Sequence, residues 1–354
     1  MPRTLASLLR RLLPAVLLLT VGALGAGCRE SPPVAHFYYV NELSPLELLR
    51  SRAVHMSLLS PQWLFVAGQG KLASTVDAEV VRWARENGVP LMPLLLNYDF
   101  KREIAHELLT ADRLQADLIE SLMQVAMEHR FYGIQLDFEN VPIEDRDRYV
   151  EFVRRLRKAL RQRGMKLSVA VPAPLAAAPL TDKTTAVNWP QTEQSLAFDY
   201  RRLGKEADFL TLMAYDQHTA PDAPGPVAGL PWVEASLRWV LKSVSRKKLH
   251  LGVPLYYRQW AGEEVNEGTY AEALAIAARV GASPRLDAEQ MERTLEFEGD
   301  GARAVVWYQD AETLQRRLEL VRRYKLRGFS AWRLGQEDPA AWGRVFPAGA
   351  VRVR

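Results

Sequence analysis

The sequence predicts an α/β fold, a (β/α)8 TIM barrel with a small α+β insertion between strands seven and eight. From residue 34 onward, short apolar runs alternate with stretches of helical periodicity, which is the pattern of repeated βα units and a parallel sheet. Eight such runs suffice to close a barrel. The 354 residues hold one barrel of about 250 residues, an insertion and a leader, so one domain is the economical interpretation.

The first 27 residues have the pattern of an export signal. Three arginines precede an apolar run over residues 12–19, and small residues follow it up to Gly27. The run falls short of the about 20 apolar residues of a membrane-spanning helix, which favours cleavage. The segment L-G-A-G-C, which ends at Cys28, resembles a bacterial lipobox, so we expect Cys28 to be lipidated. Ordinary secretion is the alternative.

The expected lipid anchor bears on location. Arg29 follows Cys28, whereas an aspartate at this position would resemble an inner-membrane retention signal. The outer membrane is therefore the expected location, and the sequence does not determine which face of it. Residues 28–33 form a short linker, which spans about 20 Å at full extension. The domain is therefore expected to lie close to its membrane.

The composition excludes several classes of protein. Three of the four net positive charges lie in the leader, so residues 28–354 have a net charge of +1 and lack the electrostatic footprint of nucleic-acid binding. The basic runs over residues 154–161 and 316–323 have helical spacing and are expected on solvated faces. A single cysteine cannot form an intramolecular disulfide, and the six scattered histidines show no metal-ligand spacing. We expect a monomer without metal or other cofactor.

The elements follow in order over residues 34–347, with a tail at 348–354. Strands are expected at residues 35–40, 55–60, 90–96, 132–139, 166–172, 208–214, 249–255 and 327–333. Amphipathic helices are expected between them, for example at residues 77–87, 111–129, 145–163 and 311–324, with Gly88 and Gly164 at helix C-termini. Residues 257–308 exceed one helix and contain a helical stretch at 270–280 and strand-like runs at 295–297 and 304–308, which predicts the insertion.

The fourth strand ends in carboxylates. Residues 132–139 read Y-G-I-Q-L-D-F-E, and the period of two places Gln135, Asp137 and Glu139 on one face, with apolar residues on the other. Two neighbouring acids are costly to bury unless they share a proton or find partners, which indicates a functional site. An edge strand whose polar face meets water is the alternative.

Three further strands end in residues suited to a pocket, because the active sites of such barrels lie at the carboxyl ends of the strands. Strand six ends in L-T-L-M-A-Y-D-Q-H, strand seven leads into Y-Y-R-Q-W, and strand eight ends in G-F-S-A-W-R. A flat indole at the mouth suits stacking against a sugar ring, although core packing or a covering loop are alternatives for single residues. The residues expected at the mouth are Met213, Tyr215, Asp216, Tyr256, Tyr257, Arg258 and Trp332.

These motifs together resemble the family 18 glycoside hydrolases, the chitinase-like barrels, over about residues 34–346. The family pattern D-G-x-D-x-D-x-E is matched by Y-G-I-Q-L-D-F-E, which keeps the glycine, Asp137 and Glu139. The family M-x-Y-D is matched at residues 213–216, G-x-P-x-Y-x-R at residues 252–258, and the strand-eight tryptophan at Trp332.

Three segments narrow the resemblance within the family. S-P-Q-W at residues 60–63, P-G-P-V-A-G-L-P-W-V at 224–233 and V-W-Y-Q-D at 306–310 are most similar to the branch that includes spore-cortex-lytic glucosaminidases. That branch acts on peptidoglycan. The resemblance therefore favours peptidoglycan over chitin or another glycan as the polysaccharide partner.

The resemblance implies retaining hydrolysis assisted by the substrate, in which the 2-acetamido oxygen of an N-acetylated sugar replaces a protein nucleophile. It assigns Glu139 as the acid and base, and Asp137 as the partner that orients the acetamido N–H. Tyr215, helped by Asp216, would donate a hydrogen bond to the acetamido oxygen, and Trp332 would form the floor of the subsite. Further substrate contacts are expected from Gln135, Met213, Tyr257, Arg258 and Trp63.

Two positions depart from the family pattern, since Tyr132 and Gln135 replace its first and second aspartates. Gln135 can hydrogen-bond Asp137 but cannot share a proton or carry charge, which predicts a changed pH profile and slower turnover. The alternatives are an inactive barrel that serves as a sugar-binding lipoprotein, a glycosidase with two catalytic carboxylates, and a structural protein of the envelope. Endo and exo cleavage both stay open.

Overall fold

The computed structural model describes residues 32–41, 43, 46–176, 191–299, 302–346 and 348–353. The expected export signal over residues 1–27 and the expected lipidation of Cys28 lie outside the described residues. Pro33–Arg354 forms one compact unit. Within the described part of the chain, no helix combines the length and the apolar character that a membrane crossing requires.

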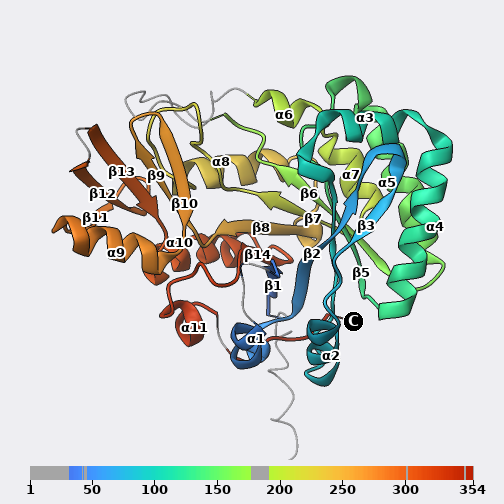
Figure 1. Ribbon diagram of the computed structural model, residues 1–354, viewed down its shortest axis with the longest axis horizontal. Helices are drawn as coiled ribbons and strands as arrows, with labels where there is room; N and C mark the ends of the chain where they lie inside the picture. The colour runs from blue at the N-terminus through green and yellow to red at the C-terminus, as the bar shows by residue number, and fades with distance from the viewer. Residues whose placement is uncertain are drawn as a thin grey trace, which may run out of the picture. The chain divides into compact units, whose positions relative to one another are not determined.

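Eight parallel strands close a barrel (Figure 1), which confirms the predicted fold class. Their order is β1–β2–β4–β5–β6–β7–β8–β14, and β14 pairs with β1 to complete the ring. The short strand β3 (Leu72–Ser74) extends β2 as an antiparallel hairpin. The barrel strands are β1 (Val34–Tyr39), β2 (Leu58–Val66), β4 (Leu94–Asn97), β5 (Gly133–Asp137), β6 (Lys166–Pro172), β7 (Phe209–Met213), β8 (Leu249–Pro254) and β14 (Gly328–Trp332).

Each predicted strand overlaps an observed one, and the second is displaced most. The sequence places it at residues 55–60, whereas β2 begins at Leu58 and runs to Val66. The preceding residues, Ala53–His55, form a 3-10 turn in which His55 Nδ1 lies 2.6 Å from the carbonyl oxygen of Phe346. A partner so distant along the chain leaves no local signal, so the apolar run alone could not locate this boundary.

Helices follow the strands and surround the barrel (Figure 1). Helix α2 begins after Asp77, whose carboxylate accepts the backbone N–H groups of Glu79 and Val80. Gly88 and Gly164 have φ values of 61° and 71° and lie just beyond helix ends, as predicted. The helices outside the insertion are α1 (Leu46–Arg52), α2 (Ala78–Glu86), α3 (Arg102–Thr110), α4 (Asp112–His129), α5 (Arg146–Arg161), α6 (Glu193–Leu196), α7 (Tyr200–Glu206), α8 (Leu230–Val240), α10 (Ala311–Arg323) and α11 (Ala341–Arg344).

A layer of polar side chains is buried among the barrel strands. Gln135 Nε2 donates to Ser168 Oγ (3.1 Å) and to Thr211 Oγ1 (3.0 Å), and Thr211 Oγ1 lies 3.2 Å from Ser330 Oγ. Burial lowers the pKa of His36 to about 3, so this histidine is neutral near pH 7. The polar layer is satisfied mainly from within. Its members, all fully buried, are His36, Ser60, Gln135, Ser168, Thr211, His250 and Ser330.

The insertion lies between β8 and α10, in the predicted range of 257–308. It is an antiparallel sheet in the order β10–β9–β13–β12–β11 with helix α9 beside it (Figure 1). Its own small core joins Tyr257 of the sheet to Ala273 and Ile276 of the helix. The elements are β9 (Tyr257–Ala261), β10 (Glu264–Gly268), α9 (Tyr270–Val280), β11 (Arg285–Asp287), β12 (Glu292–Gly299) and β13 (Ala302–Tyr308).

Candidate active site

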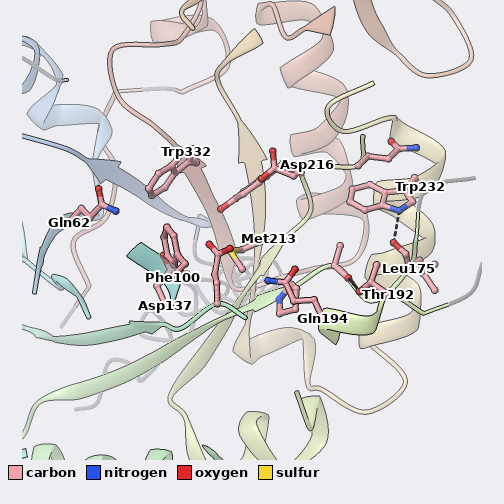
Figure 2. A pocket seen from close by; sticks show the side chains of 15 residues that line it. Gln62, Phe100, Asp137, Leu175, Thr192, Gln194, Met213, Asp216, Trp232 and Trp332 are labelled. Carbon is pink, nitrogen blue, oxygen red and sulfur yellow. Dashed lines mark hydrogen bonds between the residues drawn. The ribbon is translucent and has the colours of Figure 1, made fainter. Parts of the chain in front are cut away.

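A pocket lies at the carboxyl ends of the barrel strands, where the sequence predicts it. Asp137 ends β5, Glu139 follows it, Met213 ends β7 and Trp332 ends β14. Figure 2 shows Asp137, Met213 and Trp332 around one opening together with Asp216. The other residues that line the pocket are Gln62, Phe100, Pro172, Ala173, Leu175, Thr192, Gln194, Tyr215, Gln217 and Trp232.

The period of two along β5 separates an apolar face from a face that carries the carboxyl groups. Ile134, Leu136 and Phe138 are fully buried in the main core. Asp137 is buried at the pocket, and Glu139 is partly exposed there. Because β5 pairs with β4 on one side and β6 on the other, it is a central strand, and the edge-strand alternative is wrong.

Asn97 fixes the backbone at Glu139. Its Nδ2 donates to the carbonyl oxygen of Glu139 and its Oδ1 accepts the Glu139 N–H, both at 3.0 Å. Asn97 is fully buried at the end of the neighbouring strand β4. We did not predict this residue, although it follows the third predicted strand at its carboxyl end, where the barrel rule directs attention.

Both carboxyl groups of the pair favour their protonated forms. Burial raises the pKa of Glu139 well above its ordinary value, and the charges of Asp137 and Asp216 raise it further, whereas a hydrogen bond with Gln194 opposes the shift. Burial also raises the pKa of Asp137. Asp137 Oδ1 has no hydrogen-bond donor among the described residues. The pair can therefore hold a proton near neutral pH and still accept a hydrogen bond from a ligand.

Tyr215 stands beside the acid pair as a neutral donor. Burial raises the pKa of its phenol well above the ordinary value, and the nearby charges of Tyr38 and Asp137 act in the same direction. Gly252 of β8 leaves room for it, because a Cβ there would lie 2.9 Å from the Tyr215 ring and 2.5 Å from the carbonyl oxygen of Leu212. The glycine of the G-x-P segment thus has a steric role.

Asp216 is positioned by an ion pair with Arg258 of the insertion. Arg258 Nη1 lies 2.8 Å from Asp216 Oδ1, and the hydroxyl of Tyr256 donates to the same oxygen. The Arg258 guanidinium also donates to the carbonyl oxygen of His218 (3.1 Å) and to Glu267 Oε2 (3.3 Å). Arg258 is buried and does not line the pocket, so its predicted substrate contact is replaced by a contact with Asp216.

Trp332 forms an apolar wall of the pocket. Its ring centroid lies 5.3 Å from that of Tyr38 at an interplanar angle of 55°, so Tyr38 of β1 supports the indole. Met213 lines the same pocket and is partly exposed. Carboxyl, phenol and indole groups thus supply the chemistry here, and among the described residues no three His, Cys, Asp or Glu side chains gather as a metal site requires.

Three other residues predicted to contact the substrate do not line the pocket. Trp63 is fully buried in the main core and donates through Nε1 to Asn41 Oδ1 (2.7 Å). Tyr257 belongs to the core of the insertion. Gln135 lies in the buried polar layer, and its amide donates to Ser168 and Thr211. Gln62, the neighbour of Trp63 on β2, lines the pocket instead, because adjacent strand residues face opposite sides. Tyr256, in the bend before β9, donates to Asp216.

Part of the rim comes from residues that were not predicted to belong to the site. Thr192 and Gln194 line the pocket from the segment that precedes and begins α6. Trp232 of α8 lines it too and donates through Nε1 to the carbonyl oxygen of Leu175 (2.9 Å; Figure 2). Of these residues, only Trp232 lies in a segment that resembles the family, namely P-G-P-V-A-G-L-P-W-V at residues 224–233.

A buried ion pair positions the loop between β7 and α8. Glu292 accepts the N–H groups of Val227 (2.9 Å) and Ala228 (3.1 Å), and its Oε2 lies 3.2 Å from Arg317 Nη2. Both charged side chains are fully buried, so the prediction that Arg317 lies on a solvated face is wrong. The loop also holds Gln217, whose N–H donates to the Val227 carbonyl oxygen (2.9 Å) and which lines the pocket.

Known proteins share this sequence and architecture. An uncharacterized glycosylase of Bacillus subtilis strain 168, YvbX, is 26% identical over 317 residues, which are 87% of this chain and 89% of that protein. A cortical fragment-lytic enzyme of the same organism is 28% identical over 255 residues, or 70% of this chain and 57% of its own length. The crystal structure of a chitinase from Chromobacterium violaceum matches with a TM-score of 0.79 at 29% identity, over 89% of this chain and 98% of that one.

The spore cortex-lytic enzyme SleL of Bacillus megaterium shares the fold, with a TM-score of 0.78 at 22% identity over 92% of this chain and 75% of that one. The family of glycosyl hydrolases 18 has a sequence profile that matches residues 99–337, a range that contains the acid pair and Trp332. This match spans more than half of the chain. The protein is a glycosidase and belongs to family 18 of the glycosyl hydrolases.

Proposed function

We propose that this glycosidase cleaves β-glycosidic bonds next to N-acetylglucosamine in peptidoglycan, with retention of configuration and with assistance from the substrate. The observation that carries the proposal is the pair formed by the buried Asp137 and the partly exposed Glu139 in a pocket walled by Trp332. An acid with a raised pKa can protonate a leaving group at neutral pH. The indole offers a stacking surface for a sugar ring.

The first step needs a proton from Glu139. Glu139 gives it to the glycosidic oxygen while the acetamido carbonyl oxygen of the sugar attacks C1, so the glycosidic bond breaks and an oxazolinium ring forms. In the second step Glu139 takes a proton from the water that attacks C1, which opens the ring and restores the acid. The backbone clamp by Asn97 holds this residue in place through both steps.

The other groups stabilise the intermediate. The oxygen of Asp137 that lacks a donor accepts the acetamido N–H, and the phenol of Tyr215 donates to the acetamido oxygen. Asp216 already accepts from Tyr256 and pairs with Arg258, so it is poorly placed to act as a second catalytic carboxylate. Because Asp216 already has these two partners, a mechanism assisted by the substrate is favoured over one with two catalytic carboxylates.

The departures from the family pattern act on rate. Gln135 donates to Ser168 and Thr211 in the polar layer, and this neutral amide cannot take a proton from Asp137. Tyr132 precedes the first residue of β5, about 17 Å from Asp137 along an extended strand, and is remote from the pocket. Slow turnover is therefore expected. Because Glu139 is present and clamped, hydrolysis is favoured over the alternative of an inactive sugar-binding lipoprotein.

The choice of peptidoglycan rests on relatives. A cortical fragment-lytic enzyme matches 70% of this chain, whereas a chitinase is among the similar solved structures. To decide, the fragment from Arg29 is incubated with purified peptidoglycan and with chitin oligomers, and the new reducing-end sugar is identified by mass spectrometry. N-acetylglucosamine at the reducing end of peptidoglycan fragments supports the proposal. N-acetylmuramic acid there excludes it, and an oxazoline-mimicking inhibitor without effect excludes substrate assistance.

We also propose that the chain is an outer-membrane lipoprotein anchored through Cys28. The lipobox-like segment and the single cysteine support this proposal. Labelled palmitate should enter the wild-type chain and not the Cys28→Ala variant. Incorporation into the variant would contradict the anchor.

A further inference from the structure

The barrel end opposite the pocket carries a dense arc of positive charge. All eight barrel strands are parallel, so the segments that precede them gather at this end. Five of these strands are consecutive in the barrel, in the order β14–β8–β7–β6–β5. The segments before them contain thirteen Lys and Arg but three Asp and Glu. We name them the basic arc; they are residues 322–327, 242–248, 205–208, 161–166 and 128–132.

The basic arc is a local excess of charge. Residues 28–354 together have a net charge of +1, so the rest of the barrel is acidic. Two of the three acids in the arc are already paired, Glu206 with Arg154 and Asp208 with Arg157. Within the described residues, eight exposed cations of the arc form no ion pair, namely Arg130, Arg161, Arg163, Lys205, Lys242, Arg246, Lys247 and Arg322.

Helix dipoles explain part of this charge. Helices of the barrel end here, and cations are favoured in their last turns. This accounts for Arg161 in α5 and for Lys205 in α7. Arg246 and Lys247, however, lie in a separate 3-10 turn, Arg246–Lys248, beyond the end of α8. A requirement other than helix stability therefore applies to part of the arc.

The chain enters the barrel beside the basic arc. The N–H of Val34, the first residue of β1, donates to the carbonyl oxygen of Arg327 (3.0 Å), and the N–H of Arg327 donates to that of Arg246 (3.0 Å). Five residues lie between Cys28 and Val34, and this segment reaches about 20 Å at full extension. A surface that holds Cys28 therefore lies within reach of these cations.

We propose that the basic arc docks the barrel on an anionic phospholipid surface, with the pocket directed away from the lipid. The arc follows the rim formed by the N-terminal ends of five strands, and a rim of cations fits the flat, phosphate-bearing face of a bilayer. The pocket lies at the other end of the same parallel strands, so docking leaves it open to a polymer beyond the membrane. The proposal does not depend on which glycan is cleaved.

Vesicle binding tests the proposal without the lipid anchor. The fragment from Arg29, which contains the whole compact unit, is sedimented with phosphatidylglycerol vesicles and with phosphatidylcholine vesicles. We expect binding to the former alone, and its loss in high salt, since the Debye length falls from about 10 Å at 0.1 M to about 3 Å at 1 M. Each cation near an anionic surface contributes about fivefold, so Arg246→Gln with Lys247→Gln should weaken partitioning about 25-fold.

The matched control removes two exposed cations from the pocket end, by Lys71→Gln with Arg113→Gln. It should bind phosphatidylglycerol vesicles as the unaltered fragment does, and both double variants should keep the unaltered thermal melting curve. Equal binding to phosphatidylcholine, or equal weakening by both pairs of substitutions, would overturn the proposal. So would sedimentation with isolated peptidoglycan at a salt concentration where vesicles are not bound, because the arc would then be a site for an anionic polymer.

Discussion

Arg258 Nη1 lies 2.8 Å from Asp216 Oδ1, and the two side chains differ in exposure, 8% against 47%. The arginine belongs to β9 of the insertion, whereas the aspartate follows a barrel strand and faces the pocket. Asp216 also has a φ of 57°, in the left-handed region that few residues other than glycine adopt. A subdomain outside the barrel thus holds an acidic group of the site in place.

Removal of this contact should slow catalysis. Arg258→Met leaves the Asp216 carboxylate without its cation, and we expect kcat/KM on N-acetylglucosamine oligomers to fall about 10- to 100-fold, the usual effect of a lost charged hydrogen bond. Arg285→Met, in the same insertion, removes an exposed arginine and is the matched control. Equal rates for the two variants would show that Asp216 needs no support.

Glu139→Gln should abolish hydrolysis and leave sugar binding largely intact. The amide keeps the shape of the side chain but cannot donate the proton, and loss of a general acid lowers kcat by at least about 100-fold. Calorimetry with an N-acetylglucosamine oligomer measures binding, and reducing-sugar release measures turnover. Near wild-type turnover would remove Glu139 from the proposed role.

The same substitution should stabilise the protein above acidic pH. The pKa of Glu139 is raised in the folded state, so between the unfolded value of about 4.3 and the folded value the folded protein binds more protons than the unfolded chain. Stability is then lost as pH rises through this interval. Glu139→Gln should raise Tm at about pH 8 and change it little at about pH 4. An equal shift at both pH values would contradict the raised pKa.

Asn97→Ala should reduce kcat through Glu139. The substitution leaves a backbone N–H and C=O without their partners, at a cost of about 1–3 kcal/mol each, and frees the backbone that carries the acid. We expect lower kcat with little change in KM. Asn87→Ala, at the exposed end of α2, should leave kcat unchanged, and a decrease of the same size there would deny Asn97 its positioning role.

Breaking the buried pair of Glu292 and Arg317 should destabilise the protein more than breaking an exposed pair. Glu292→Gln leaves a buried guanidinium without its counterion, which costs about 3–5 kcal/mol. Addition of Arg317→Met should restore much of the lost Tm. Glu296→Gln, which disrupts an exposed pair with Arg303, should change stability by less than about 0.5 kcal/mol. Similar melting shifts for Glu292→Gln and Glu296→Gln would contradict the prediction.

Much of this architecture is legible in the sequence, because βα alternation and strand-end acids are local patterns. The sequence does not show, however, which of two adjacent residues faces the pocket. Trp63 was a plausible pocket residue by type, yet its neighbour Gln62 lines the pocket, since one step along a strand reverses the side. Tyr257 lies in the core of the insertion instead. No single strand reveals which of its sides meets the pocket.

Two other differences between the predicted and the observed structure have distinct causes. Arg317 lies among Leu314, Leu318 and Val321, on the apolar stripe of α10, so its burial could have been inferred from helical spacing. Its partner Glu292 comes from another subdomain, and such a long-range pairing leaves no local pattern. Gln194 reaches Glu139 in the same way, from a segment that carries no motif.

The polar layer can accept either an amide or a carboxylate at position 135. Ser168 and Thr211, which accept the Gln135 amide, bear hydroxyl groups that can also donate when their hydrogens rotate. An amide and a carboxylate can therefore occupy this place with the same two neighbours and without repacking of the barrel. Divergence between fast and slow enzymes on this scaffold can thus proceed by exchange at one buried position, while the surface that meets the sugar stays the same.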